Sequence, residues 1–166
     1  LGELRYLIPL MRYEFPSPDD NASLANSFEE TVTKFGCNNF IYFENEKWTY
    51  NQTNEAANIL ANKLVDDGVE HGDRVVLFME NRPNYIISIL ALNKIGAIGV
   101  LINTSLTGNP LIHCINSSDS KKCIVGAELA SSLEEVLTEI NVEDKSDIYW
   151  VKDCLLYTSD AADESV

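Results

Sequence analysis

The chain has 166 residues, 45% of them hydrophobic, which is enough material for about one folded domain with a buried core. Its formal net charge of −14 repels the phosphates of nucleic acids, so no DNA or RNA partner is expected. No apolar run approaches the roughly 20 residues that span a bilayer. We expect upstream sequence before Leu1, because the chain does not begin with Met.

The first part of the chain contains a break and then a helix. Residues 1–22 are interpreted as a linker or a connection to upstream sequence, because two prolines and several turn-forming polar side chains interrupt any regular element. Apolar residues at helical intervals then predict a helix that runs to about Lys34. Its N-cap is expected to be Ser23 or Asn26, since short polar side chains accept hydrogen bonds from the first backbone N–H groups of a helix.

A hairpin and a second helix follow. Two β-favouring runs, at residues 40–43 and 48–50, are separated by four polar residues and predict a short hairpin. Thr49 and Gln52 have the spacing of a capping box, in which each side chain bonds the backbone N–H of the other residue at the start of a helix. Gly68 is placed to end that helix.

The rest of the chain alternates between strand and helix patterns. In chain order we expect a strand at 74–79, a helix at 82–95, a strand at 98–102, a helix with Asn109 as its N-cap, a strand at 122–125, a helix at 128–140 and a strand at 148–151. The first two strands should be buried, and the helix between them, apolar nearly all round, should pack between layers. The fold class is therefore α/β, with part of a doubly wound, mostly parallel sheet and a short hairpin near its start.

The usual catalytic patterns are incomplete in this sequence. His71 and His113 lie in no ligand motif, and no glycine-rich phosphate-binding loop is present. The cysteines show no C-x-x-C spacing and are interpreted as buried reduced thiols, namely Cys37, Cys114, Cys123 and Cys154. We therefore predict no catalytic residue and no metal ligand.

One pair of residues is expected near a functional crevice. Asn103 and Thr104 follow the strand at 98–102, and open α/β sheets bind ligands at the carboxyl ends of their strands. These two are the candidate substrate-binding residues, and the alternative is a loop-forming Asn beside a capping Thr. Glu80 and Arg82 are interpreted as charges at the start of a helix rather than as ligand contacts.

Several short segments, in their order and spacing, resemble the start of adenylate-forming enzymes of the acyl-CoA synthetase superfamily, the AMP-dependent synthetases and ligases. They are Trp48-Thr49-Tyr50 and residues 56–61, 72–76, 78–83 and 92–97. Three further segments resemble the branch of fatty-acid transport proteins and very-long-chain acyl-CoA synthetases, namely residues 101–106, 110–115 and 123–129. The resemblance holds in good register from about Ser27 to Leu129.

The resemblance implies a two-step reaction. A fatty carboxylate attacks the α-phosphate of ATP with Mg²⁺ present, and coenzyme A then displaces AMP to give a thioester. It also implies that residues 23–153 are part of an N-terminal AMP-binding domain. In relatives the phosphate-binding loop and the catalytic lysine come later in the sequence, so this piece alone is expected to be inactive. Membrane association of the intact protein is implied as well, at the endoplasmic reticulum or plasma membrane with the catalytic part facing the cytosol.

The last residues differ in character from the rest. Residues 154–166 look like a translated sequencing adapter joined in frame, so a non-native tail is expected after Asp153. Two alternatives to a long-chain or very-long-chain fatty acid–CoA ligase stay open. One is another acyl or aryl acid–CoA ligase of the same superfamily, and the other is a non-catalytic α/β binding module that folds and acts alone.

Overall fold

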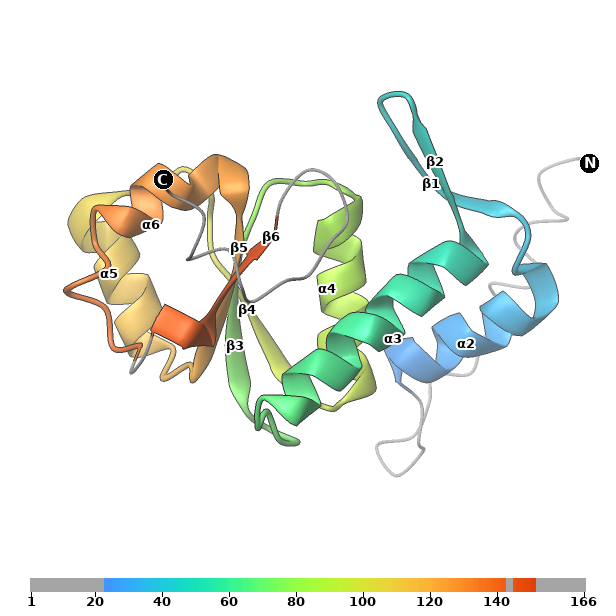
Figure 1. Cartoon of the computed structure of the whole chain (residues 1–166), viewed down its shortest axis with the longest axis horizontal. Coiled ribbons are helices and arrows are strands. Elements are labelled where there is room, and N and C mark those ends of the chain that lie inside the picture. Colours follow the sequence, from blue (N-terminus) through green and yellow to red (C-terminus); the bar gives the residue numbers. More distant parts are fainter. Residues whose placement is uncertain (1–22, 143–144, 152–166) are drawn as a thin grey trace, which may run out of the picture.

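The computed structural model describes residues 23–142 and 145–151 (Figure 1). Its centre is a four-stranded sheet in the order β4-β3-β5-β6, in which every neighbouring pair is parallel. The strands are β3 (Arg74–Phe78), β4 (Ile98–Leu101), β5 (Lys122–Gly126) and β6 (Ile148–Val151). The predicted α/β class with a mostly parallel sheet is confirmed.

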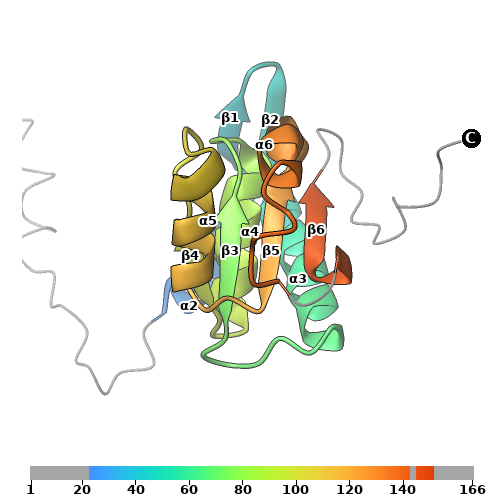
Figure 2. The ribbon, with the colours of Figure 1, turned by 90° about the vertical axis from the view of Figure 1, so that its left-hand side faces the viewer.

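Helices cover both faces of this sheet, as in a doubly wound fold (Figures 1 and 2). The helical elements are α2 (Leu24–Phe35), α3 (Tyr50–Asp66), α4 (Pro83–Lys94), α5 (Gly108–Ser117), α6 (Ala130–Glu134) and the 3-10 turns η1 (Ala127–Leu129) and η2 (Lys145–Asp147). One face carries α3 and α4, with α2 packed against both of them. The opposite face carries α5 and α6. The predictions of a linker at residues 1–22 and of a non-native tail at residues 154–166 concern residues outside the described part of the chain.

Each face of the sheet has its own apolar core, because successive residues of a strand point to opposite sides. Val75 and Leu77 of the central strand β3 belong to the cluster under α3 and α4. Val76 and Phe78 of the same strand point the other way and share a cluster with Leu111 of α5. All five side chains are completely buried.

Helix α4 lies between the sheet and the outer helices, as its all-round apolar pattern predicts. Ile87 and Leu92 are fully buried in the cluster it shares with α3. The end of α4 is tied to α2 by polar contacts: Lys94 forms an ion pair with Glu29, and a side-chain oxygen of Asn93 accepts a hydrogen bond from the backbone of α2. Among the described residues, no helix combines the length and apolar character needed to cross a bilayer.

The expected helix caps are formed. Ser23 is the N-cap of α2, and its Oγ accepts the N–H of Asn26 at 3.0 Å. At the start of α3, Thr49 Oγ1 accepts the N–H of Gln52 at 3.2 Å, and Gln52 Oε1 accepts the N–H of Thr49 at 2.9 Å. Gly68, with φ of +83°, follows the end of this helix in the left-handed conformation that favours glycine.

Replacing Thr49 by alanine should lower the free energy of unfolding by about 1 kcal/mol, because alanine offers no acceptor for the N–H of Gln52. Urea unfolding followed by circular dichroism measures this loss. Thr33→Ala on the exposed face of α2 is the matched control, and its effect should stay within about 0.5 kcal/mol. Equal losses in the two variants would contradict the capping role of Thr49.

The predicted burial of the strand at 98–102 is wrong. Strand β4 lies at the edge of the sheet and pairs only with β3 in the part of the chain that the structure describes. Ile98 and Leu101 are 49% and 54% exposed. An apolar run in the sequence indicates that a strand carries apolar side chains. Whether they are buried depends on the order of the strands in the sheet, which the run does not specify.

Two helix predictions also need correction. Helix α5 begins at Gly108 with Thr107 as N-cap, not at Asn109, because proline is tolerated anywhere in a first turn and its position does not fix the first residue. The expected helix at 128–140 is instead η1, the short α6 and a series of turns. The carboxylates of Glu134 and Glu135 disfavour a longer helix α6, because they lie at its C-terminus, where the helix dipole is negative.

The hairpin is confirmed, with a tighter turn than expected. Strands β1 (Asn39–Phe43) and β2 (Glu46–Thr49) pair antiparallel, with Glu46 opposite Phe43. Two of the four polar residues therefore belong to the second strand, which an exposed hairpin permits.

The expectation of buried cysteines holds for Cys123 only: Cys114 is half-buried, and Cys37 is exposed in the turn between α2 and the hairpin. Cys154 lies outside the described residues.

Candidate functional site

The carboxyl ends of β3, β4 and β5 lie at one edge of the sheet, because these strands are parallel. The arrowheads of β3 and β6 accordingly point the same way in Figure 2. The chain leaves β3 through α4 on one face of the sheet and leaves β5 through α6 on the other. The winding direction thus changes between β3 and β5, and open α/β sheets bind ligands outside the strand ends at such a switch point. This edge is the candidate site.

The two sequence-predicted residues lie at this edge, directly after β4. Asn103 is exposed, and its Oδ1 accepts the N–H of Ser105 at 2.9 Å. Its backbone carbonyl accepts the N–H of Leu106 at 3.1 Å, which completes a tight turn. Thr104 is half-buried within this turn. Asn103 is therefore turn-forming, and its Oδ1 is engaged in the turn, while its Nδ2 group offers two further donors.

Sequence reasoning missed a third member of this edge, Glu128, which lies in η1 directly beyond β5. Its Oε1 accepts the backbone N–H of Glu80 at 2.8 Å. Its Oε2 lies 3.2 Å from Nη1 of Arg82, in an ion pair whose side chains are 22% and 16% exposed for Glu128 and Arg82. One carboxylate therefore links the loop after β3 to the loop after β5, across the switch point.

Glu80 and Arg82 take different parts in this link. Glu80 contributes its backbone N–H, whereas Arg82 is the N-cap residue of α4 and contributes its guanidinium group. A positive charge at a helix N-terminus interacts unfavourably with the helix dipole, so the carboxylate of Glu128 offsets this interaction. The signal available in the sequence was an acidic residue just past one predicted strand and a basic residue just past its neighbour.

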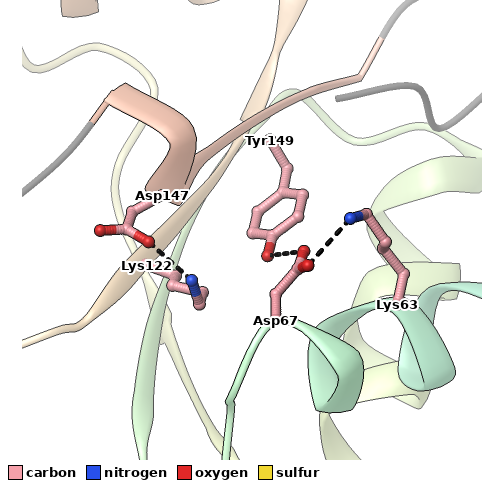
Figure 3. A network of polar contacts seen from close by, with 5 residues as sticks. All are labelled: Lys63, Asp67, Lys122, Asp147 and Tyr149. Carbon is pink, nitrogen blue, oxygen red and sulfur yellow. Dashed lines mark hydrogen bonds and ion pairs between the residues drawn. The ribbon is translucent and has the colours of Figure 1, made fainter. Parts of the chain in front are cut away.

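A second polar cluster lies at the opposite, amino-terminal edge of the sheet (Figure 3). Tyr149 of β6 donates a hydrogen bond to Asp67, at the end of α3, and Lys63 forms an ion pair with the same carboxylate at 2.9 Å. Beside them, Lys122 at the start of β5 pairs with Asp147 at 2.6 Å. The Tyr149–Asp67 contact joins β6 to the end of α3, and the Lys122–Asp147 pair joins β5 to η2, so the cluster stabilises the fold.

Burial and pairing shift the pKa values in this cluster. Burial, followed by the hydrogen bond to Asp67, raises the pKa of Tyr149 far above its ordinary value. Burial opposes ionisation of Asp67, but hydrogen bonds from Tyr149 and Lys63 outweigh it and lower the pKa of Asp67. The neighbouring thiol of Cys123 is also perturbed, since burial raises its pKa to about 12. Such a thiol stays protonated and unreactive at neutral pH.

The two histidines are not brought together in a site. The ring of His71 lies against Gly96, where a Cβ atom would be 2.3 Å from the ring. His113 lies on α5, with Nδ1 3.4 Å from the hydroxyl of Ser117. Within residues 23–142 and 145–151, no three His, Cys, Asp or Glu side chains are grouped so that they could hold a metal ion.

Residues 28–165 match the AMP-binding enzyme family. The chain belongs to this family. The resemblance noted from the motifs is thereby confirmed at the level of the family, and the match covers most of the chain, including every strand of the sheet.

Relatives within the AMP-binding enzyme family include fatty acid transport proteins and fatty acid–CoA ligases. Mouse long-chain fatty acid transport protein 6 is 31% identical over 102 residues, which cover 61% of this chain and 16% of the relative. A medium/long-chain-fatty-acid–CoA ligase of Mycobacterium tuberculosis is 31% identical over 118 residues, covering 71% and 20%. Rat long-chain fatty acid transport protein 2 is 32% identical over 128 residues, covering 76% and 21%. The chain thus spans about a sixth to a fifth of the length of these relatives.

Solved structures of AMP-binding enzymes share the fold. An anthranilate CoA ligase in complex with anthranoyl-AMP has a TM-score of 0.72 at 21% identity, over 78% of this chain and 25% of that one. A long-chain-fatty-acid-CoA ligase from Archaeoglobus fulgidus has a TM-score of 0.70 at 24% identity, over 84% and 30%. At this level of identity the likeness defines the fold alone.

Proposed function

We propose that the intact protein is a long-chain or very-long-chain fatty acid–CoA ligase. The observation that carries this is the membership of the AMP-binding enzyme family together with 31–32% identity to relatives named as fatty acid transport proteins and fatty acid–CoA ligases. In this reaction ATP activates the fatty carboxylate as an acyl-adenylate, and coenzyme A then takes the acyl group as a thioester.

We further propose that Asn103 and Thr104 contact substrate at the carboxyl edge of the sheet. The support is their place in the turn after β4, at the same carboxyl edge of the sheet as the switch point between β3 and β5. ATP, Mg²⁺ and coenzyme A are the co-substrates and metal that the reaction requires. We assign no Mg²⁺ ligand within residues 23–142 and 145–151.

Residues 23–153 are proposed to form part of the N-terminal AMP-binding domain, inactive without the rest of the protein. Residues 1–22 would connect it to preceding sequence, and 154–166 would be a non-native tail, which the genomic sequence after Asp153 tests directly. Association of the intact protein with the cytosolic face of the endoplasmic reticulum or plasma membrane is part of the same proposal, supported by the fatty acid transport proteins among the relatives.

The experiment that tests the function is an assay of the purified intact protein with ATP, Mg²⁺, coenzyme A and fatty acids of increasing chain length. We expect AMP and acyl-CoA to form in equal amounts, and only when both a fatty acid and coenzyme A are present. The 166-residue chain assayed alone is the matched control and should form neither product. Absence of both products from the intact protein with every fatty acid would contradict the proposal.

The same assay separates the alternatives. Product with anthranilate but not with fatty acids would favour an aryl acid–CoA ligase, the activity named for one structural neighbour. No product with any acid, combined with a monomeric and cooperatively folded 166-residue chain, would favour a binding module. The exposed apolar edge of β4 argues against the module, since an open sheet edge promotes association between chains.

A further inference from the structure

The ladder between β3 and β5 ends just before the candidate site. Phe78 lies opposite Val125 near the carboxyl ends of the two strands. Beyond this pair the two backbones separate, because β3 continues toward α4 and β5 continues into η1. The N–H of Glu80 nevertheless has an acceptor from the β5 side, since the carboxylate of Glu128 reaches it at 2.8 Å. A side chain therefore continues the connection where the backbone ladder stops.

The negative charge of the same carboxylate also compensates the positive charge of Arg82 in the loop after β3. Arg82 is the N-cap residue of α4 and lies 3.2 Å from Glu128 Oε2. Both side chains are mostly shielded from water, so salt screens their interaction less than it screens an exposed pair. Each oxygen of Glu128 thus holds a different group of one loop, the N–H of Glu80 and the guanidinium of Arg82.

Gly126 makes room for this arrangement. A Cβ atom on Gly126 would lie 2.2 Å from Oε1 of Glu128, which is closer than nonbonded atoms can approach. The backbone at Gly126 has φ of −69° and ψ of 137°, a conformation that alanine adopts without strain. Glycine is therefore required at this position because the carboxylate of Glu128 occupies the space of a Cβ atom, and not because the backbone conformation is unusual.

From these contacts we propose that Glu128 is a positioning residue for the ligand-binding edge. By fixing the loop after β3 to the end of β5, it holds these two loops at a set separation at the switch point. The proposal rests on the function proposed above, because it takes this edge of the sheet to be part of a substrate site. No role for Glu128 in the chemical steps is implied, since it acts through the loop that contains Glu80 and Arg82.

Three variants separate the effects of the carboxylate. Glu128→Ala removes both contacts, whereas Glu128→Gln keeps an acceptor for the N–H of Glu80 and removes the charge opposite Arg82. Gly126→Ala keeps the glutamate at position 128, but the added Cβ atom displaces its carboxylate. Because Gly126→Ala acts only through that displacement, adding it to Glu128→Ala should cause no further change. Glu135→Ala, in the turns that follow α6 and exposed, is the matched control for loss of a carboxylate.

The first measurement is amide hydrogen exchange at Glu80 in the intact protein. We expect exchange to accelerate at least tenfold in Glu128→Ala and Gly126→Ala, to change less in Glu128→Gln, and to stay unchanged in Glu135→Ala. Unaltered exchange in Glu128→Ala would overturn the proposal, because the carboxylate would then not fix the loop.

The second measurement is steady-state kinetics of the intact protein carrying the same substitutions. A change in the separation of the two loops should raise the KM for at least one substrate about tenfold in Glu128→Ala, with kcat altered less than twofold. Glu128→Gln should restore part of the loss, which a general structural defect would not show. Unchanged KM values despite faster exchange at Glu80 would overturn this inference and leave the ligase function standing. If the unmodified intact protein activates no carboxylic acid, both proposals fall.

Discussion

Phe78→Ala is expected to lower the free energy of unfolding by about 3–5 kcal/mol. Phe78 is completely buried at the end of the central strand β3, in the cluster that joins the sheet to α5 and α6. Removing the ring loses the favourable free energy of its transfer from water into the core. It also leaves a cavity, because other side chains hold the surrounding layers apart. Because a domain of this size has a total stability of about 5–15 kcal/mol, the variant should lose a large share of that stability.

Urea unfolding followed by tryptophan fluorescence measures the effect. Tyr42→Ala provides the control, since it also truncates an aromatic side chain but one that is 68% exposed on the hairpin. Its cost should stay below about 1 kcal/mol. A loss in Phe78→Ala no larger than that in Tyr42→Ala would contradict the placement of β3 at the centre of the core.

Tyr149→Phe should lower the free energy of unfolding by about 1–3 kcal/mol at neutral pH, because it removes a hydrogen bond to a charged carboxylate. This loss of stability should become smaller at both low and high pH. The pKa of Asp67 is lowered in the folded protein, so its contribution is present above about pH 4 and is lost as the pH falls. The pKa of Tyr149 is raised, so its contribution is present below about pH 10 and is lost as the pH rises.

The difference in stability between the unmodified chain and Tyr149→Phe is therefore expected to be largest between about pH 5 and pH 9, and to shrink toward either extreme. Taking a difference is essential, because the buried thiol of Cys123 also loses stabilising protonation at high pH in both chains. Urea unfolding at a series of pH values gives the profile. Tyr42→Phe, at an exposed tyrosine, is the control, and a profile as strong there as for Tyr149→Phe would refute the role of the Tyr149–Asp67 bond.

Local rules allowed most elements to be predicted from the sequence. The Thr49 and Gln52 pair, for example, requires only residues three positions apart, and the structure forms both of its hydrogen bonds. The exposure of β4 could not be obtained this way. Ile98 and Leu101 look like core residues in sequence, and only the strand order places them at an edge.

The candidate site was predictable to the same extent. Asn103 and Thr104 follow from the rule that ligands bind at strand carboxyl ends, which needs only a strand boundary. Glu128 was missed because its partners Glu80 and Arg82 lie 48 and 46 positions earlier in the chain and because a helix was expected to begin at this residue. Its meaning depends on β5 lying beside β3, and no local pattern specifies which strands become neighbours.

The strand order β4-β3-β5-β6 also constrains how the protein can be assembled during synthesis. Translation delivers β3 first, then β4, and only after α5 the strand that completes the other side of β3. A nascent chain that has reached α5 therefore holds its central strand with one flank uncovered. Pairing with β5 closes a long loop and is a slow kind of contact in folding. During this interval the unpaired flank of β3 exposes backbone hydrogen-bonding groups and apolar side chains that a chaperone would have to protect.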